Sequence, residues 1–309
     1  MQEGSKKAIL AAFMANLGIA VAKFIGFLFT ASAGLLAEAF HSVADTGNQG
    51  LLLLGSARGK KKPSAIHPFG YGRERYFWAF VVAMVLFSLG GVFAIYEGIN
   101  KFRHPHETEY LAVAMGVLGV AVVLESLSLR TAIREARRLA GRTPLWRFIR
   151  ESRQPELPVV LLEDIGAEIG LVVALLGVTL TALTDNPRWD AVASIVIGLV
   201  LVVIALFLAR ETKSLLIGES TTQSNEDDIV RAIEQNPSVR RIIHLRTQHL
   251  APEQVLVTVK IEFDNALNMH ELALAIDSVE ADVRAMLPTA DKIFIEPDIY
   301  RTEDSPKER

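Results

Sequence analysis

The sequence contains no cysteine among its 309 residues. Disulfide bonds and metal sites built on thiolates are therefore excluded. A strong charge of one sign is also missing, because 32 Lys and Arg residues nearly balance 35 Asp and Glu residues. Neither nucleic acid nor a generally acidic partner is therefore indicated. We find no glycine-rich phosphate-binding loop that would indicate a nucleotide-driven mechanism, and we expect no cleavable signal peptide.

What the sequence does contain is apolar residues in long blocks. Half of the residues are hydrophobic, and the mean hydropathy is +0.31. Each block is about as long as the hydrocarbon core of a bilayer requires. The blocks predict an α-helical, multi-pass integral membrane protein with six transmembrane helices, over residues 8–30, 33–56, 76–98, 110–130, 157–182 and 189–210.

Basic residues are concentrated in two of the links between these segments. The second link carries Arg58, Lys60, Lys61, Lys62, Arg73 and Arg75, and the fourth carries Arg134, Arg137, Arg138, Arg142, Arg147, Arg150 and Arg153. The positive-inside rule places both links in the cytoplasm, and six spans then put both termini there. We expect the inner membrane of a bacterium. Residues 131–140 of the fourth link predict a helical extension, followed by an interfacial segment held by anionic lipid.

The composition changes after Lys213, which predicts a membrane domain over residues 1–214 and a cytoplasmic domain over 215–309. A helix is expected over 225–235 with Ser224 as its N-cap, and strands over 239–247, 255–263 and 292–296. Asn268 is expected to cap a helix that ends at Leu287, with Glu271 completing a capping box. The order αββαβ predicts a ferredoxin-like small sheet with both helices on one face.

Ionisable residues interrupt two of the apolar segments. His41 and Asp45 are one helical turn apart, and so are Asp164 and Glu168. Ionisable side chains at membrane depth usually face a bundle interior or a watery cavity. An imidazole and several carboxylates suit a divalent cation such as zinc or manganese. The alternative for His41 and Asp45 is a polar pair that packs two helices together.

Longer motifs surround these residues. Ala-Glu-Ala-Phe-His41-Ser-Val-Ala-Asp45 and His67-Pro-Phe-Gly-Tyr-Gly-Arg-Glu, with six spans and an αββαβ domain, resemble the cation diffusion facilitator family. The resemblance covers nearly the whole chain. It implies a homodimer that exchanges divalent metal, most often zinc, for protons. Glu163 and the extended basic link look like the branch related to the zinc transporter 9 group.

The fifth predicted helix departs from the family pattern, which has His-x-x-x-Asp there. In one alignment Asp164 takes the Asp place and Val160 takes the His place. In the other alignment Asp164 and Glu168 occupy the two ligand places. Counting residues along the two spans puts Glu168 closer to the level of Asp45. Alternatives to ligation are a proton carrier or supporting acid for Glu168, and an arginine partner for Glu163.

The predicted function is therefore metal export, with His41, Asp45, Asp164, Glu168 and Glu163 as candidate ligands. Protons compete with metal for these groups, so metal efflux would be coupled to proton influx. Zinc is expected first, with manganese, iron or cobalt as alternatives because carboxylates harden the site. No catalytic cofactor and no enzyme activity are expected. The rival interpretations are a membrane-anchored sensing or scaffold protein without transport and a passive channel.

Overall fold

The computed structural model describes residues 3–105, 110–141 and 143–301. By its internal contacts the chain divides into two units. The first contains the residues up to Arg58 together with Glu74–Lys213. The second contains the residues from Ser214 onward together with Gly59–Arg73. The basic link 59–73 thus belongs by contacts with the C-terminal unit rather than with the helices that it joins.

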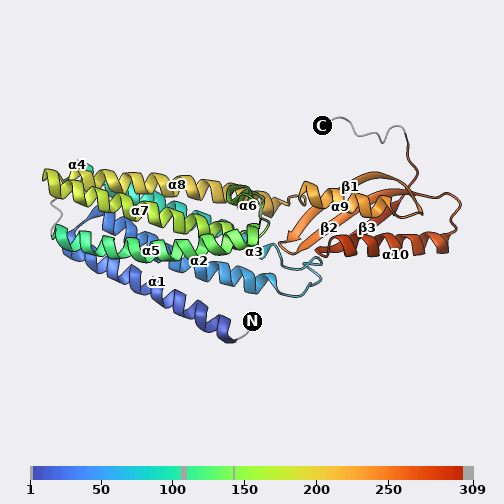
Figure 1. The fold of residues 1–309 in the computed structure, drawn as a ribbon, viewed down its shortest axis with the longest axis horizontal. Coiled ribbons are helices and arrows are strands. Elements are labelled where there is room, and N and C mark those ends of the chain that lie inside the picture. Colours follow the sequence, from blue (N-terminus) through green and yellow to red (C-terminus); the bar gives the residue numbers. More distant parts are fainter. Residues whose placement is uncertain (1–2, 106–109, 142, 302–309) are drawn as a thin grey trace. The chain divides into compact units, whose positions relative to one another are not determined.

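The first unit is a bundle of long helices that run alongside one another (Figure 1). In chain order they are α1 (Glu3–Thr30), α2 (Ala33–Gly59), α3 (Glu74–Val85), the π-helix η1 (Leu86–Val92), α4 (Phe93–Arg103), α5 (Leu111–Ala140), α6 (Leu145–Glu151), α7 (Glu156–Thr184) and α8 (Arg188–Ile217). Each of the six predicted segments coincides with helix to within a residue. The third continues without a break through α3, η1 and α4, and α5 includes the predicted extension over 131–140.

Among the described residues, three helical segments are long and apolar enough to cross a membrane by length and composition alone. They are Glu74–Arg103, Leu111–Arg138 and Arg188–Ile217, with mean hydropathies of 2.3, 2.1 and 3.2 over their apolar windows. α1 has a shorter apolar segment, Leu17–Thr30. The two remaining long helices, α2 and α7, are the ones that carry the predicted site residues.

Glycines allow α8 to lie directly against η1 and α4. A Cβ atom on Gly198 would lie 2.6 Å from the carbonyl oxygen of Gly91, and one on Gly98 would lie 2.8 Å from that of Ala191. Small residues permit such close backbone approach between membrane helices. The third and sixth predicted spans are thereby held together as one packed pair.

A buried acid fixes the turn between α1 and α2. Asp190 of α8 accepts hydrogen bonds from the Ser32 hydroxyl at 2.8 Å and the Ala33 amide at 2.7 Å, and from Lys101 Nζ at 2.9 Å. Lys101 also donates to the Ala31 carbonyl at 2.7 Å. A carboxylate suits a helix N-terminus, where backbone amides lack partners. This network joins α2, α4 and α8 at the same end of the bundle.

The second unit contains α9 (Gln223–Glu234), β1 (Val239–Ala251), β2 (Gln254–Phe263), α10 (Met269–Met286) and β3 (Ala290–Pro297). The predicted αββαβ order is confirmed. The strands lie in the order β1-β2-β3, with β1 antiparallel and β3 parallel to β2. Alternate β2 residues form one apolar core with both helices, including Val257 of β2, Ile229 of α9 and Val279 of α10. Both helices therefore cover one face of the sheet, as predicted.

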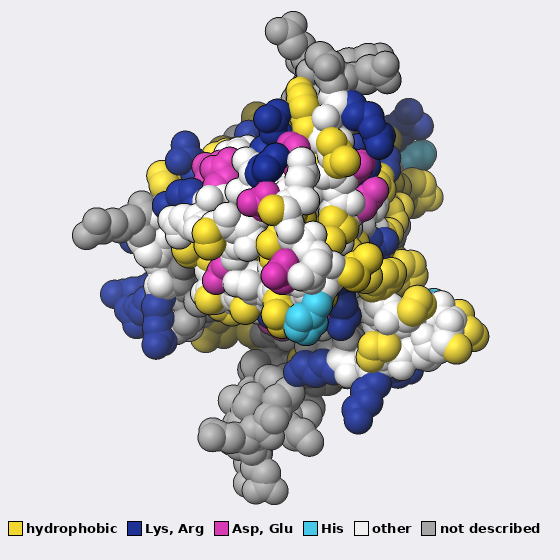
Figure 2. Space-filling model, turned by 90° about the vertical axis from the view of Figure 1, so that its right-hand side faces the viewer, with side chains coloured by type: hydrophobic (Ala, Val, Ile, Leu, Met, Phe, Trp, Pro, Cys, Tyr) yellow, Lys and Arg dark blue, Asp and Glu magenta, His cyan; other side chains and the backbone are white. Residues whose placement is uncertain are grey.

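The two predicted helix caps had different outcomes. Asn268 caps α10 and forms a complete capping box with Glu271, as expected. Ser224 was the wrong cap for α9, because the helix begins earlier. Thr222 has extended backbone, and its hydroxyl accepts from the Asn225 amide. Figure 2 shows acidic, basic and hydrophobic side chains interspersed on the face that it presents.

Candidate metal centre

α2 brings His41 and Asp45 together in the interior of the bundle. His41 is fully buried, and its Nε2 lies 3.4 Å from Asp45 Oδ2. Neither imidazole nitrogen has a hydrogen-bond partner among the described residues, and Asp45 Oδ1 also lacks one. Buried polar atoms are nearly always hydrogen-bonded. The two side chains thus present nitrogen and oxygen lone pairs that the protein itself leaves unused.

The π-helix η1 lies beside His41. A Cβ atom on Gly90 would lie 3.9 Å from His41 Nδ1, so the glycine brings the backbone of η1 close to the ring. Short π segments within α-helices are found frequently at functional sites. The apolar sequence over 76–98 predicts one uninterrupted helix and gives no sign of this π-helical segment.

A cavity of about 90 Å³ adjoins Asp45. Its lining residues come from α1, α2, α5 and α7 and are Ile19, Ser42, Asp45, Gln49, Glu125, Ser128, Val160, Glu163 and Asp164. A cavity of this size has room for several water molecules or a hydrated ion. Four carboxylates from three helices therefore surround one small polar cavity.

The cavity distinguishes the two alignments of α7. Val160 and Asp164, the places of the first alignment, both line it, and Glu163 lines it as well. Glu168 is not among the lining residues. Its Oε1 accepts a hydrogen bond from Ser126 of α5 at 2.7 Å. The structure therefore brings Asp164 and Glu163 together with Asp45 and places Glu168 elsewhere on α7.

An amide holds Glu163 in place. Asn48 of α2 donates from Nδ2 to Glu163 Oε1 at 2.6 Å, and Glu163 is only 4% exposed. The predicted alternative, an arginine partner, is not what the structure places at Glu163. Asn48 lies one turn beyond Asp45 on α2, so a single face of that helix supplies both groups. The amide can orient the Glu163 carboxylate toward a cation without adding charge.

Two further acids lie close to these groups, although no sequence motif marked them as site residues. Glu125 lines the cavity from α5. Glu38 is completely buried one turn before His41, and its Oε2 accepts from Lys23 of α1 at 3.1 Å. Lys23 also donates to Ser42 at 2.8 Å. The signal for Glu38 was present in the motif Ala-Glu-Ala-Phe-His41, but nothing in the sequence identified its partner.

These groups do not form a closed set of ligands. Within the part of the chain that the structure describes, no three His, Asp or Glu side chains lie close enough together to hold a metal ion. The acids instead surround a polar cavity, with His41 adjoining it through Asp45. Small movements of α2 against α7 would therefore change how many of them reach one ion.

The C-terminal unit offers a different arrangement of acids. Glu296 and Asp298 lie close together at the end of β3, and Lys260 contacts both, at 3.1 and 2.9 Å. The hydrogen bond from Lys260 holds the pKa of Asp298 below its ordinary value of 3.8. Asp298 likewise raises the pKa of Lys260. A resident cation therefore occupies the place where these carboxylates converge.

Comparison with known proteins gives a family match for each unit. Residues 9–217 match the family described as cation efflux transmembrane domain, and residues 222–300 match the cation efflux protein, cytoplasmic domain. The proton-coupled zinc antiporter SLC30A9, mitochondrial, is 33% identical over 264 residues in Mus musculus and 31% in Homo sapiens. These matches cover 85% of this chain and 47% and 46% of the relatives. The chain thus spans about half the length of these relatives.

More distant relatives differ in the metal that they are named for. The manganese efflux system protein MneP of Bacillus subtilis is 21% identical over 309 residues, and the match covers 97% of both chains. Among solved structures, a nickel form of a MamM CTD variant is 20% identical, with a TM-score of 0.24. That match covers 26% of this chain and all of the other.

Proposed function

The chain belongs to the cation efflux family, and from this premise we propose that it exports divalent metal ions, zinc first, in exchange for protons. The observation that carries the proposal is the polar cavity between α2, α5 and α7. Four carboxylates line it, and among the residues whose side chains are described no Lys or Arg forms an ion pair with them. Buried charges are normally paired or bind metal.

We assign Asp45 and Asp164 as the central ligands, with His41 and Glu163 completing the set as the helices move. Zinc accepts both imidazole nitrogen and carboxylate oxygen. Since Val160 stands in place of a second histidine, oxygen donors outnumber nitrogen donors, and this makes manganese, iron or cobalt possible competitors. The affinity order of divalent metals still places zinc above manganese. Glu168 is left to a supporting role, because it is not among the residues that line the cavity and its Oε1 accepts a hydrogen bond from Ser126.

Proton coupling follows from the chemistry of the same groups. Carboxylates and imidazole bind metal only when they are deprotonated, so metal binding releases protons and protons release metal. A cavity that faces the cytoplasm would load metal, and the same groups facing the acidic side would exchange it for protons. Neither nucleotide nor a second site is needed for this cycle. A homodimer in a lipid bilayer is the proposed working form.

Reconstitution in liposomes tests the proposal. We expect saturable zinc uptake that is driven by an imposed pH gradient and that stops when an ionophore collapses the gradient. Asp45→Asn should abolish uptake, because it removes a ligand charge and keeps the shape of the side chain. Asp277→Asn is the matched control, since Asp277 is exposed on α10. Normal gradient-driven uptake by folded Asp45→Asn protein would refute the assignment.

The absence of cysteine allows a clean test of the membrane topology. Single cysteines at Lys61 and Asp185 report on the second and fifth links with no background labelling. We expect a membrane-impermeant maleimide to modify Lys61→Cys only from the cytoplasmic side and Asp185→Cys only from the opposite side. Labelling of both from one side would contradict the arrangement of spans that alternating access requires.

A further inference from the structure

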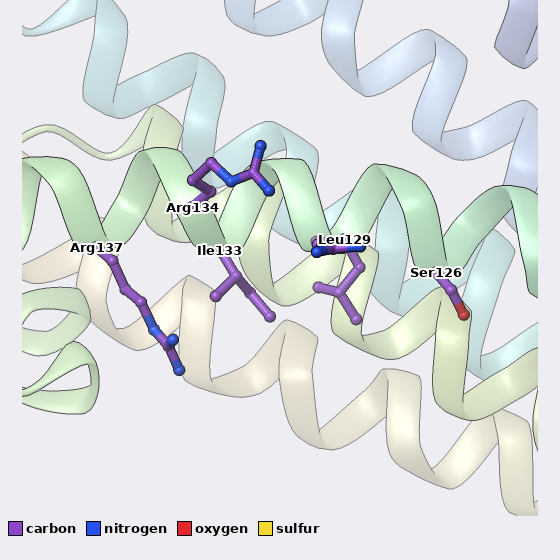
Figure 3. A pocket seen from close by; sticks show the side chains of 6 residues that line it. Ser126, Leu129, Ile133, Arg134 and Arg137 are labelled. Carbon is purple, nitrogen blue, oxygen red and sulfur yellow. The ribbon is translucent and has the colours of Figure 1, made fainter.

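A groove of about 540 Å³ follows the C-terminal part of α5. It is lined by Ser126, Leu129, Arg130, Ile133, Arg134 and Arg137. In Figure 3 the labelled side chains follow one another along the helix, with Ile133 and Arg137 pointing to one side and Arg134 to the other. The groove lies within the first unit and shares no lining residue with the candidate metal centre. It is therefore a separate feature of the bundle.

The described charged residues that line this groove are all arginines. Arg130, Arg134 and Arg137 are spaced at i, i+4 and i+7, which places them along one side of α5. All three are exposed, and in the described part of the chain none of them forms an ion pair. Among the residues whose side chains the structure describes, no acid lines the groove. Three guanidinium groups are thus available to an anion, and their planar donor forks suit a phosphate.

The floor of the groove is apolar. Leu129 and Ile133 pack against a buried cluster formed by Ala136, Ile149 and Leu161. That cluster joins α5 to α6 and α7, so the apolar lining is fixed rather than mobile. A small soluble anion would make no use of it. A ligand with a phosphate group and an attached hydrocarbon chain would satisfy both parts of the groove.

The neighbouring helix α6 indicates that the groove lies at the depth of lipid headgroups. Trp146 is 60% exposed, and its ring lies 5.4 Å from that of Phe207 on α8. Tryptophan is enriched where the hydrocarbon core meets the headgroups. Arg150 of α6 is also exposed. Short basic helices with an aromatic residue commonly lie in the membrane interface.

From these observations we propose that the α5 groove binds one anionic phospholipid of the cytoplasmic leaflet. The positive charge of Arg130, Arg134 and Arg137 attracts its phosphate, and Leu129 and Ile133 contact the first part of an acyl chain. The bound lipid fixes the C-terminal half of α5 against α6. Binding requires neither metal nor a proton gradient, so it can be measured independently of transport.

The test is lipid binding to the delipidated full-length protein, measured by native mass spectrometry with phosphatidylglycerol and with phosphatidylcholine. The variant is Arg130→Gln/Arg134→Gln/Arg137→Gln. The matched control is Lys60→Gln/Lys61→Gln/Lys62→Gln, which removes the same charge from the other basic link. Each basic residue near an anionic surface contributes roughly fivefold to binding. We therefore expect phosphatidylglycerol affinity to fall on the order of a hundredfold in the arginine variant and to change little in the control.

Each outcome decides the matter. Equal losses in the two variants would show diffuse surface electrostatics and overturn the proposal, as would unchanged binding in the arginine variant. Equal binding of phosphatidylcholine by the parent would overturn the requirement for an anionic lipid. Displacement of the lipid by inorganic phosphate at low millimolar concentration would identify a soluble-anion site instead. Thermal unfolding of both variants confirms that each is folded, and Leu129→Asn/Ile133→Asn separately tests the apolar floor.

Discussion

The acids around the cavity of the bundle differ from the acids of the C-terminal sheet in whether a basic side chain faces them. In the C-terminal unit, carboxylates face resident cations: Asp298 faces Lys260 at 2.9 Å, and Asp264 faces Arg240 at 3.0 Å. In the bundle, Asp45 and Asp164 face a cavity, and no described Lys or Arg forms an ion pair with either of them. Exposed acids cost little when left alone, whereas buried ones cost several kcal/mol, on the order expected for desolvating an ion. The acids at the cavity, where burial costs more, are therefore the ones that no described Lys or Arg pairs with.

This difference indicates that an exchangeable cation would bind at the cavity of the bundle rather than in the C-terminal unit. A protein gains nothing in stability by burying unpaired acids, so their retention at such a place points to function. Glu296 and Asp298 already have Lys260 as their partner, and a metal ion would have to displace it. Glu38 is an informative exception, because, like Asp190 with Lys101, it is an acid within the bundle that has a buried cation of its own, Lys23. The bundle therefore does contain acids that are paired with a basic side chain, as Glu38 is with Lys23.

The largest expected effect comes from breaking that exception. Lys23→Met leaves Glu38 buried without its cation, and removal of one partner of a buried pair costs about 3–5 kcal/mol. We expect a large fall in thermal stability in detergent. The double variant Lys23→Met/Glu38→Gln should recover most of the loss, because it removes the stranded charge. A single variant as stable as the parent would show that Glu38 does not depend on Lys23.

The next effect separates the two alignments of α7. Asp164→Asn removes a proposed ligand, and we expect zinc transport to fall by at least roughly a hundredfold, the upper end of what loss of a supporting partner costs. Glu168→Gln retains its hydrogen bond to Ser126 and should change transport only a few fold. Uptake kinetics in liposomes measure both. The reverse ranking would restore the alignment in which Glu168 is a ligand.

Much of the fold could be predicted from the sequence because its signals are local. Alternation over 255–263 predicted a half-buried strand, and Asn268 with Glu271 predicted a helix start within one residue. The α9 cap was placed two residues late because Thr222 and Ser224 are chemically equivalent caps. The choice between them depends on where the chain leaves α8, which no local pattern records.

The sequence was enough to predict a metal site, but not to predict every residue that lines it. His41 and Asp45 are one turn apart on one helix, so spacing alone brings them together. Glu125 could not be assigned, because its role depends on how α5 packs against α2 and α7. Counting residues along separate helices favoured Glu168, but helices in a bundle differ in tilt and axial position. The π-helix η1 also has no propensity signal, since apolar residues and glycines are compatible with several helix types.

A smaller effect is expected from the group that supports Glu163. Asn48→Leu removes the donor to Glu163 Oε1 at nearly constant volume. Loss of such a partner typically costs a site about tenfold or more in metal affinity. We expect the zinc concentration for half-maximal uptake to rise about tenfold. The matched control is Ser126→Ala, which removes the donor to Glu168 and should leave uptake within about twofold. Equal effects would remove the distinction between Glu163 and Glu168.

The smallest effect tests the paired acids of the C-terminal unit. Because Lys260 lowers the pKa of Asp298 in the folded protein, the pair stabilises the fold above the ordinary pKa of Asp. This stabilisation is lost as the pH falls through the lower folded value. Lys260→Ala should therefore lower stability slightly at pH 7 and flatten its decline below pH about 4. Thermal unfolding across that range, followed by a tryptophan introduced at the exposed Phe294, measures this. Added zinc should change neither curve if Lys260 is the resident cation, whereas zinc that stabilised the parent would show that these acids too exchange their partner.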